Sequence, residues 1–170
     1  MLVRSGCLMF LLLLGGIAEA KQPAILSIEV SAGDGVGLGG GGVGALTLRM
    51  SPMTLSLVAD YAIIAYPWVS LYGGLRGETI GRAGIGGIIG FRLRPARGPL
   101  RIGIALNTML APYTLAGPAG TIGACWRPTH KGWGLCGDLE ITAFMMGNDL
   151  PPGRVVAQGA GLLGVVFDAL

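Results

Sequence analysis

The sequence predicts an all-β domain: a closed antiparallel up-and-down transmembrane β-barrel of eight strands, with ten strands as the alternative. Three observations support this prediction. Apolar and polar residues alternate with a period of two along most of the chain, which is typical of strands with two unlike faces. Turn-forming residues separate the alternating segments at even spacing. Charged residues make up only 12% of the chain, whereas a soluble domain carries about 25%, so the surface is not expected to face mainly water.

The first twenty residues resemble a secretory signal peptide. Arg4 precedes a short apolar core at Leu8–Ile17, and Ala18–Ala20 forms a small-x-small cleavage site. The alternative is a retained transmembrane helix, but the uncharged stretch Ser5–Ala18 is shorter than the roughly 20 residues that a span needs. We therefore predict a cleaved signal peptide over residues 1–20 and one β-barrel domain over residues 21–170.

About nine segments of the remaining chain show the alternation. The clearest is Leu100–Asn107, in which leucine and isoleucine alternate with Arg101, Gly103, Ala105 and Asn107. The nine segments are 26–31, 45–50, 53–60, 69–76, 89–94, 100–107, 119–126, 135–142 and 155–168; the segment 119–126 is weak and the last one alternates less cleanly. Bacterial single-chain barrels have an even number of strands, so one of these segments is expected not to be a barrel strand.

Glycine and proline indicate the turns between these segments. The predicted turns are Gly33–Gly42, Ser51–Pro52, Gly77–Gly81, Pro95–Pro99, Pro112–Pro118, Arg127–Gly132 and Gly147–Gly153. Gly35, Gly37 and Gly40 have the spacing of a dinucleotide fingerprint, but strand alternation follows them and the motif requires a helix there. We interpret this segment as a surface loop.

The composition of the two faces decides which one points outward. The polar face consists largely of Gly, Ala, Ser and Thr with isolated charges of both signs, which fits a narrow filled lumen. The charged residues predicted to form an interior ion-pair cluster are Glu29, Arg49, Asp60, Arg76, Arg92, Arg94, Arg101, Asp138 and Glu140. Asp138 and Glu140 lie two apart on one strand, so an acid pair or half a metal site is the alternative for these two carboxylates.

Aromatic residues lie near the ends of the predicted strands. They are Tyr66, Trp68, Tyr113, Trp126 and Trp133. Amphipathic rings favour the boundary between water and lipid, although ordinary packing beneath loops explains the same positions.

With these features the chain resembles the small bacterial outer-membrane β-barrel proteins of the eight-stranded class with filled interiors. The resemblance rests on the Ala18–Ala20 signal and on alternations such as Leu100–Asn107, and it covers residues 21–170. It implies an outer-membrane location in a Gram-negative cell, contact with membrane lipid, and insertion by the barrel-insertion machinery. Such proteins usually end on an aromatic residue, whereas this chain ends Phe167–Leu170.

Two cysteines follow the predicted cleavage site. Cys125 and Cys136 form an even pair in an exported and oxidising setting, so we predict a disulfide between them. Two buried free thiols are the alternative.

Other function classes receive little support from the sequence. The net charge is +3 and the arginines are scattered, unlike the basic stripe of a nucleic-acid-binding protein. His130 is the single histidine, and a lipid-modifying enzyme would need a serine and a carboxylate to converge on it. The sequence predicts no catalytic, cofactor-binding or metal-binding residue.

The predicted function is therefore structural or interactive, with envelope or extracellular protein contacts through loops such as Gly33–Gly42 and Arg127–Gly132. One alternative is an exported soluble β-barrel that binds a small apolar ligand, and another is a narrow outer-membrane pore. A helical membrane protein is a further alternative, because residues 102–126 carry no charge. Prolines within that stretch and its strand alternation argue against a helix.

Overall fold

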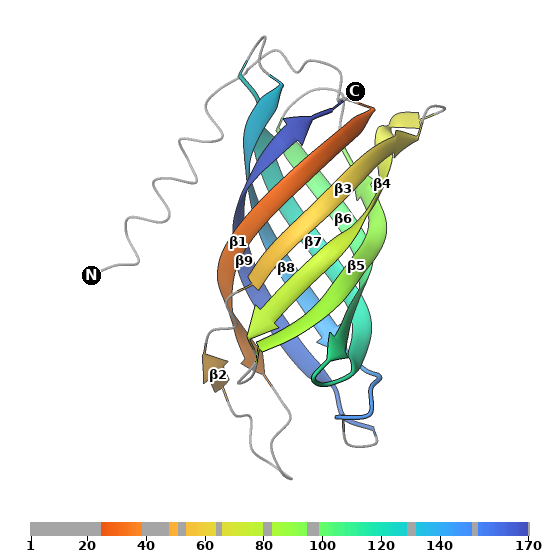
Figure 1. Cartoon of the computed structure of the whole chain (residues 1–170), viewed down its shortest axis with the longest axis vertical. Helices are drawn as coiled ribbons and strands as arrows, with labels where there is room; N and C mark the ends of the chain where they lie inside the picture. The colour runs from red at the N-terminus through yellow and green to blue at the C-terminus, as the bar shows by residue number, and fades with distance from the viewer. Residues whose placement is uncertain are drawn as a thin grey trace, which may run out of the picture.

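The described residues form an antiparallel β-barrel (Figure 1). The computed structural model describes residues 25–38, 48–50, 54–63, 66–79, 83–94, 99–128, 132–150 and 153–169. Its strands are β1 (Leu26–Leu38), β2 (Leu48–Met50), β3 (Thr54–Ile63), β4 (Tyr66–Thr79), β5 (Ala83–Leu93), β6 (Leu100–Ala111), β7 (Leu115–Trp126), β8 (Trp133–Phe144) and β9 (Val156–Asp168). The predicted signal peptide over residues 1–20 lies outside these ranges.

The barrel closes because its first and last strands pair with each other. Neighbouring strands pair in the order β1-β3-β4-β5-β6-β7-β8-β9, and β1 pairs with β9 from Ser27 opposite Asp168 to Leu38 opposite Ala157. A closed wall has no unpaired sheet edge. The structure thus confirms the prediction of an all-β, closed antiparallel barrel with eight strands.

The alternating segment 45–50, which contains β2, is not a separate barrel strand. β2 pairs with the end of β1, with Met50 opposite Val36, whereas β3 pairs with the earlier part of β1 up to Gly33 opposite Thr54. Because β9 occupies the other edge of β1, β2 lies on the same edge as β3. β2 therefore extends the β1–β3 side of the wall beyond the barrel.

Three predicted turns contain strand residues instead. In the turn predicted over Gly77–Gly81, residues 77–79 belong to β4, because they continue the pairing with β5. β1 continues to Leu38, so the prediction of a loop over Gly33–Gly42 is wrong for residues 33–38; glycine does not end the strand there because β9 pairs with it throughout. The turn predicted over Pro112–Pro118 ends early, because β7 begins at Leu115. Pro118 lies where the β7–β8 ladder is interrupted, between the Ala116–Met146 bridge and Ala119, so its missing N–H is tolerated.

Alternate side chains of each strand point into the lumen and toward the outer face, as the period of two in the sequence predicts. Along β6, Arg101 and Asn107 are buried while Ile102 and Ile104 are exposed. The core of the molecule is thus the lumen. We call the end at which β1 begins and β9 ends the proximal end, and the opposite end the distal end; the proximal end is at the top of Figure 1.

Candidate functional site

The candidate site is the polar lumen, and in its proximal half Arg101 of β6 lies between two carboxylates. Its Nη1 and Nη2 atoms are each 2.7 Å from an oxygen of Glu29 on β1. Its Nε atom is 2.7 Å from Oδ1 of Asp138 on β8, and Nη2 also contacts Oδ2 of Asp138. Each carboxylate therefore receives two donors from one guanidinium, which is the strongest arrangement of such a pair. Three strands are linked across the lumen.

A second arginine approaches Glu29 from β5. Nη1 of Arg92 lies 3.1 Å from Oε2 of Glu29, and its guanidinium carbon lies 4.4 Å from the ring centroid of Tyr72 on β4. The ring face attracts the cation, while Glu29 supplies the opposite charge. We call Glu29, Arg92, Arg101 and Asp138 the proximal ion cluster.

A glycine makes space for this cluster. In the sheet, Arg101 faces Gly123 of β7, and Gly123 in turn faces Asp138. A Cβ atom at Gly123 would overlap Oδ1 of Asp138 and the carbonyl oxygen of Gly137. The absence of a side chain on β7 thus lets Arg101 reach across to β8.

Smaller polar contacts surround the proximal rim. Nε of Arg94 donates to Oγ of Ser70 over 3.2 Å. Asp168 accepts a hydrogen bond from Ser27 over 3.2 Å and pairs with Nη2 of Arg127 over 3.2 Å. Because Arg127 and Asp168 are only partly buried, water screens this pair more than the pairs within the lumen.

Further toward the distal end a second polar layer crosses the lumen. Nη1 of Arg76 on β4 lies 2.5 Å from Oε1 of Glu140 on β8, and both side chains are buried. Thr142 donates to the same oxygen over 3.0 Å, and Asn107 donates to Thr142 over 3.4 Å. Arg76 thus has a buried carboxylate as its partner.

The distal part of the lumen is apolar. Met109, Leu115 and Phe144 are buried against one another, and the residues packed around them are Tyr113, Leu150 and Val156. We call Met109, Leu115 and Phe144 the distal apolar cluster. Phe144 and Met109 have no exposed surface, so apolar side chains fill the lumen at this end.

The structure brings most of the predicted interior charges together. Glu29, Arg92, Arg101 and Asp138 form one group, Arg76 and Glu140 form another, and Arg94 lies beside Ser70. The side chains of Asp60 and Arg49 lie outside the described residues. The backbone of Asp60 on β3 faces Ser27 and Tyr72, and Arg49 lies on β2, which is not a barrel strand.

The predicted disulfide is confirmed. Cys125 of β7 and Cys136 of β8 face each other in the sheet and are joined. The bond closes the β7–β8 hairpin next to its connecting loop at the proximal end.

Several residues that fill the lumen were not singled out from the sequence. Tyr72 is a partner of Arg92, and the distal apolar cluster comes from strand positions of the same parity as the ion pairs. Met109 follows Arg101 by an even number of residues, so the period of two places both in the lumen. The parity of these positions could have identified the apolar residues of the lumen. It is a weak indication, because apolar residues are expected on the outer face of a membrane barrel.

The two carboxylates of β8 that the sequence offered as an acid pair both belong to ion pairs. Asp138 and Glu140 do face the same lumen, yet each is paired with a different arginine. Within the described ranges no three His, Cys, Asp or Glu residues are placed to hold a metal ion.

No helix of the described part of the chain has the length and hydrophobicity to cross a membrane. His130 lies outside the described residues.

Comparisons of the chain with protein-family models, with curated proteins and with solved structures find no match. The geometry by itself defines the class: an eight-stranded antiparallel barrel whose lumen is filled by ion pairs toward one end and by apolar side chains at the other.

Proposed function

We propose that the chain is a membrane-spanning β-barrel of a bacterial outer membrane, with a structural or surface-interaction role in the cell envelope and no catalysis. The proposal depends on how the side chains are divided between the lumen and the outer face.

The observation that carries the proposal is an apolar belt on the outer face of all eight barrel strands. Its members are Ile28, Val30, Leu57, Leu71, Leu75, Ile85, Ile89, Phe91, Leu93, Leu100, Ile102, Ile104, Leu106, Leu110, Ile122, Leu135, Leu139, Ile141, Leu163 and Phe167, all exposed. Exposed apolar patches of soluble monomers rarely exceed a few hundred Å². A globular partner covers one side of a barrel, whereas bilayer hydrocarbon surrounds it.

The hydrogen bonding of polar groups in the barrel wall also supports a membrane environment. Closure through β1 and β9 leaves no strand edge, as a span through hydrocarbon requires. Thr108 lies on the outer face, and its hydroxyl donates to the carbonyl oxygen of Gly87 over 3.0 Å. The hydroxyl group of Thr108 therefore has a hydrogen-bond partner within the barrel wall.

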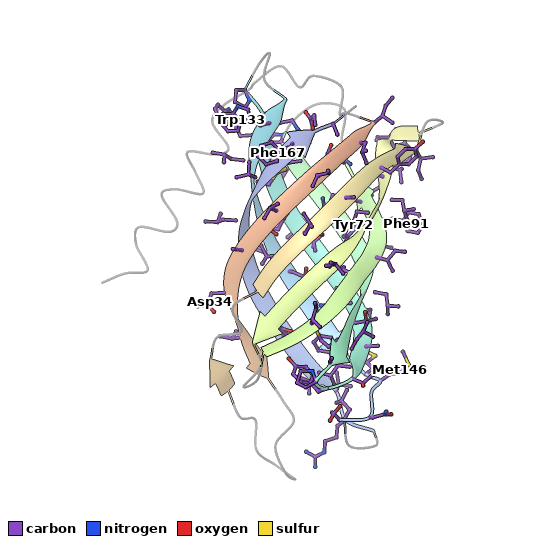
Figure 2. The ribbon with its side chains drawn as sticks, viewed as in Figure 1. Asp34, Tyr72, Phe91, Trp133, Met146 and Phe167 are labelled. Carbon is purple, nitrogen blue, oxygen red and sulfur yellow. A yellow bond between two sulfur atoms is a disulfide. The ribbon has the colours of Figure 1, made fainter. Side chains whose placement is uncertain are left out.

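One charged side chain, Asp34, stands out among the described outward positions of the strands (Figure 2). It lies on β1 just past the last residue that pairs with β3, Gly33, toward the distal end. A charge costs about 2–4 kcal/mol at the bilayer midplane and about 0–1 near the interface. Asp34 therefore fits a position at the distal boundary of the belt.

The lumen supports a structural role. Arg76, Arg92 and Arg101 form ion pairs with buried carboxylates, and the distal apolar cluster fills the lumen beyond them. The exported soluble barrel with an apolar ligand would need an apolar lumen and a polar exterior, which is the reverse of this arrangement.

A narrow pore is the second candidate, favoured by the polar side chains that line the lumen between the two ends. The distal apolar cluster opposes it, because Phe144 and Met109 are completely buried. A liposome swelling assay decides between the two. We expect no solute flux, and robust flux would favour the pore.

The test of the membrane proposal is fractionation of the full chain expressed in a Gram-negative host. We expect the protein in the outer-membrane fraction, extracted only by detergent and migrating faster on gels before heating than after. As a matched pair, Ile104→Arg places a charge on the belt of β6 and Ile104→Val does not. Only the arginine variant should insert poorly. A chain that stays in plain buffer without detergent would contradict the proposal.

A further inference from the structure

One buried side chain of the lumen, Gln158 on β9, belongs neither to the ion pairs nor to the distal apolar cluster. Gln158 points into the lumen, because it has the same parity on β9 as the buried residues Leu162 and Val166. Only 3% of Gln158 is exposed. Within the described part of the chain, neither its Oε1 atom nor its Nε2 atom has a hydrogen-bond partner. Buried amide groups are nearly always hydrogen-bonded to protein or to ordered water, so this amide requires a polar partner.

Gln158 lies at the boundary between the second polar layer and the distal apolar cluster. In the β8–β9 ladder it faces Thr142, and the next lumen-facing pair toward the distal end is Phe144 opposite Val156. Thr142 belongs to the second polar layer, whereas Phe144 belongs to the distal apolar cluster. In this ladder, therefore, the polar neighbour of the Gln158 amide is Thr142.

The hydroxyl group of Thr142 has room for one further hydrogen bond. A hydroxyl group has one proton to donate and two lone pairs that accept. Thr142 donates its proton to Oε1 of Glu140 over 3.0 Å and accepts a hydrogen bond from Nδ2 of Asn107 over 3.4 Å. Its second lone pair can accept from a molecule between Thr142 and Gln158. That molecule must donate to Thr142, whereas the amide of Gln158 can both donate and accept.

The strand on the other side of Gln158 contributes no side chain to this part of the lumen. On β1, Gly37 faces Gln158, and the next lumen-facing residue toward the proximal end is Gly35. Gly35 faces Ala160, the next lumen-facing residue of β9. Because these neighbours are glycine and alanine, the side chains of β1 and β9 do not fill the lumen beside the amide.

We propose that Gln158 and Thr142 hold an enclosed water molecule in the lumen. Water both donates and accepts hydrogen bonds, so one molecule can donate to Thr142 and also bind the Oε1 or Nε2 atom of Gln158. Buried waters typically make about three hydrogen bonds to polar groups that would otherwise lack a partner. A larger polar solute would need a passage, and the lumen is filled on both sides of this position.

The two ends of the lumen separate this water molecule from solvent. Toward the distal end, Phe144 and Met109 have no exposed surface. Toward the proximal end lie the buried Arg76–Glu140 pair and then the proximal ion cluster. The water should therefore exchange slowly with solvent, whereas water in a narrow pore would exchange rapidly. The inference concerns the lumen and does not depend on what surrounds the outer face.

Magnetisation transfer from water to Gln158 tests the inference by nuclear magnetic resonance. The sequence has two glutamines, Gln22 and Gln158, so Gln22→Glu leaves Gln158 as the single residue that carries isotope-labelled glutamine. The full chain is purified in deuterated detergent, and transfer is measured to the γ-protons of Gln158, which do not exchange with water. We expect Overhauser cross-peaks of opposite sign in the laboratory and rotating frames, as a water molecule that stays bound during tumbling of the protein produces.

Variants in the same background identify what holds and encloses the water. Thr142→Val keeps the shape of the side chain but removes the hydroxyl group, so the cross-peak at Gln158 should fall several-fold. The control Thr108→Val removes a hydroxyl group on the outer face and should leave the cross-peak unchanged. Phe144→Ala opens the distal apolar cluster, so the water should exchange rapidly and the two cross-peaks should have the same sign. Heat-dependent gel mobility shows which variants are folded, and the Gln22→Glu protein decides the inference if the others do not fold.

Each contrary outcome overturns a defined part of the inference. No cross-peak at Gln158 in the folded Gln22→Glu protein would overturn the water site. Cross-peaks of equal sign in that protein would overturn the enclosure and favour the narrow pore. A cross-peak that Thr142→Val leaves unchanged would overturn Thr142 as the partner, and unchanged signs in Phe144→Ala would overturn the distal apolar cluster as the seal. All of these outcomes leave the membrane proposal intact, because that proposal depends on the outer face.

Discussion

The two ends of the lumen are filled by different chemistry, and the Arg76–Glu140 pair lies between them. In the proximal half, Arg101 holds Glu29 and Asp138 together through directional charge contacts. At the distal end, Met109 and Phe144 fill the space through packing alone. A buried ion pair is sensitive to the removal of one partner, since the other charge is left without compensation. An apolar cluster is sensitive to volume instead. The two regions enclosed by the barrel wall should therefore differ in which substitutions they tolerate.

Arg101→Met should produce the largest effect, because it leaves Glu29 and Asp138 buried without their shared cation. We expect the free energy of unfolding to fall by about 3–5 kcal/mol, measured by urea unfolding in detergent micelles with tryptophan fluorescence. Glu29 keeps Arg92 as a partner, whereas Asp138 loses its cation, so adding Asp138→Asn to this variant should recover part of the loss. A single variant as stable as the native protein would show that the cluster contributes little.

Met109→Ala tests the distal half. Loss of a buried side chain leaves a cavity, and we expect a decrease of about 3 kcal/mol in the free energy of unfolding. The control Met109→Leu conserves most of the volume and should cost less than about 1.5 kcal/mol. Equal losses for the two variants would contradict packing as the basis of this half.

Gly123→Ala tests whether the missing side chain on β7 makes space for the proximal ion cluster. The added methyl group would overlap Asp138, and such overpacking costs about 1–3 kcal/mol. Gly120 lies on the same strand, and a Cβ atom there meets no atom within 4 Å. Gly120→Ala should therefore leave the urea midpoint unchanged. Equal urea midpoints for the two variants would contradict the idea that Gly123 makes space for the cluster.

Arg127→Ala should have the smallest effect. Arg127 pairs with Asp168 at the proximal rim, where both side chains are partly exposed. Such pairs contribute about 0–1 kcal/mol and are weakened by salt. Urea unfolding at low and high salt should show a small loss only at low salt. A loss as large as that of Arg101→Met would mean that the rim pair behaves as a buried one.

The strand pattern was predictable because alternate side chains must point to opposite faces of a sheet. This simple geometry placed Arg101 in the lumen and Ile102 outside. It worked less well for β9, where Leu162 and Val166 are buried in the lumen, so both faces of the strand are apolar. It also missed the continuation of β1 through Gly33–Leu38, because pairing with β9 overrides the weak strand propensity of glycine.

The partners within the lumen could not be predicted from the sequence. Arg101 and Glu29 are 72 residues apart, and their contact depends on strand order, register and the tilt of the closed wall. The disulfide was predictable because only two cysteines follow the predicted signal peptide. The distal apolar cluster was not, since a lumen of small residues and ion pairs was expected throughout. Nothing in the local pattern distinguishes Met109 from an outward-facing apolar residue except its parity.

The pairing of β1 with β9 has a consequence for how the chain reaches its final form. β1 hydrogen-bonds to β9, which lies 118 residues or more further along the chain, so a sheet in which these two strands are not yet paired has two free edges. The barrel wall therefore closes only when both of these strands are in place. Until β1 and β9 pair, the exposed strand edges and the apolar outer face favour aggregation.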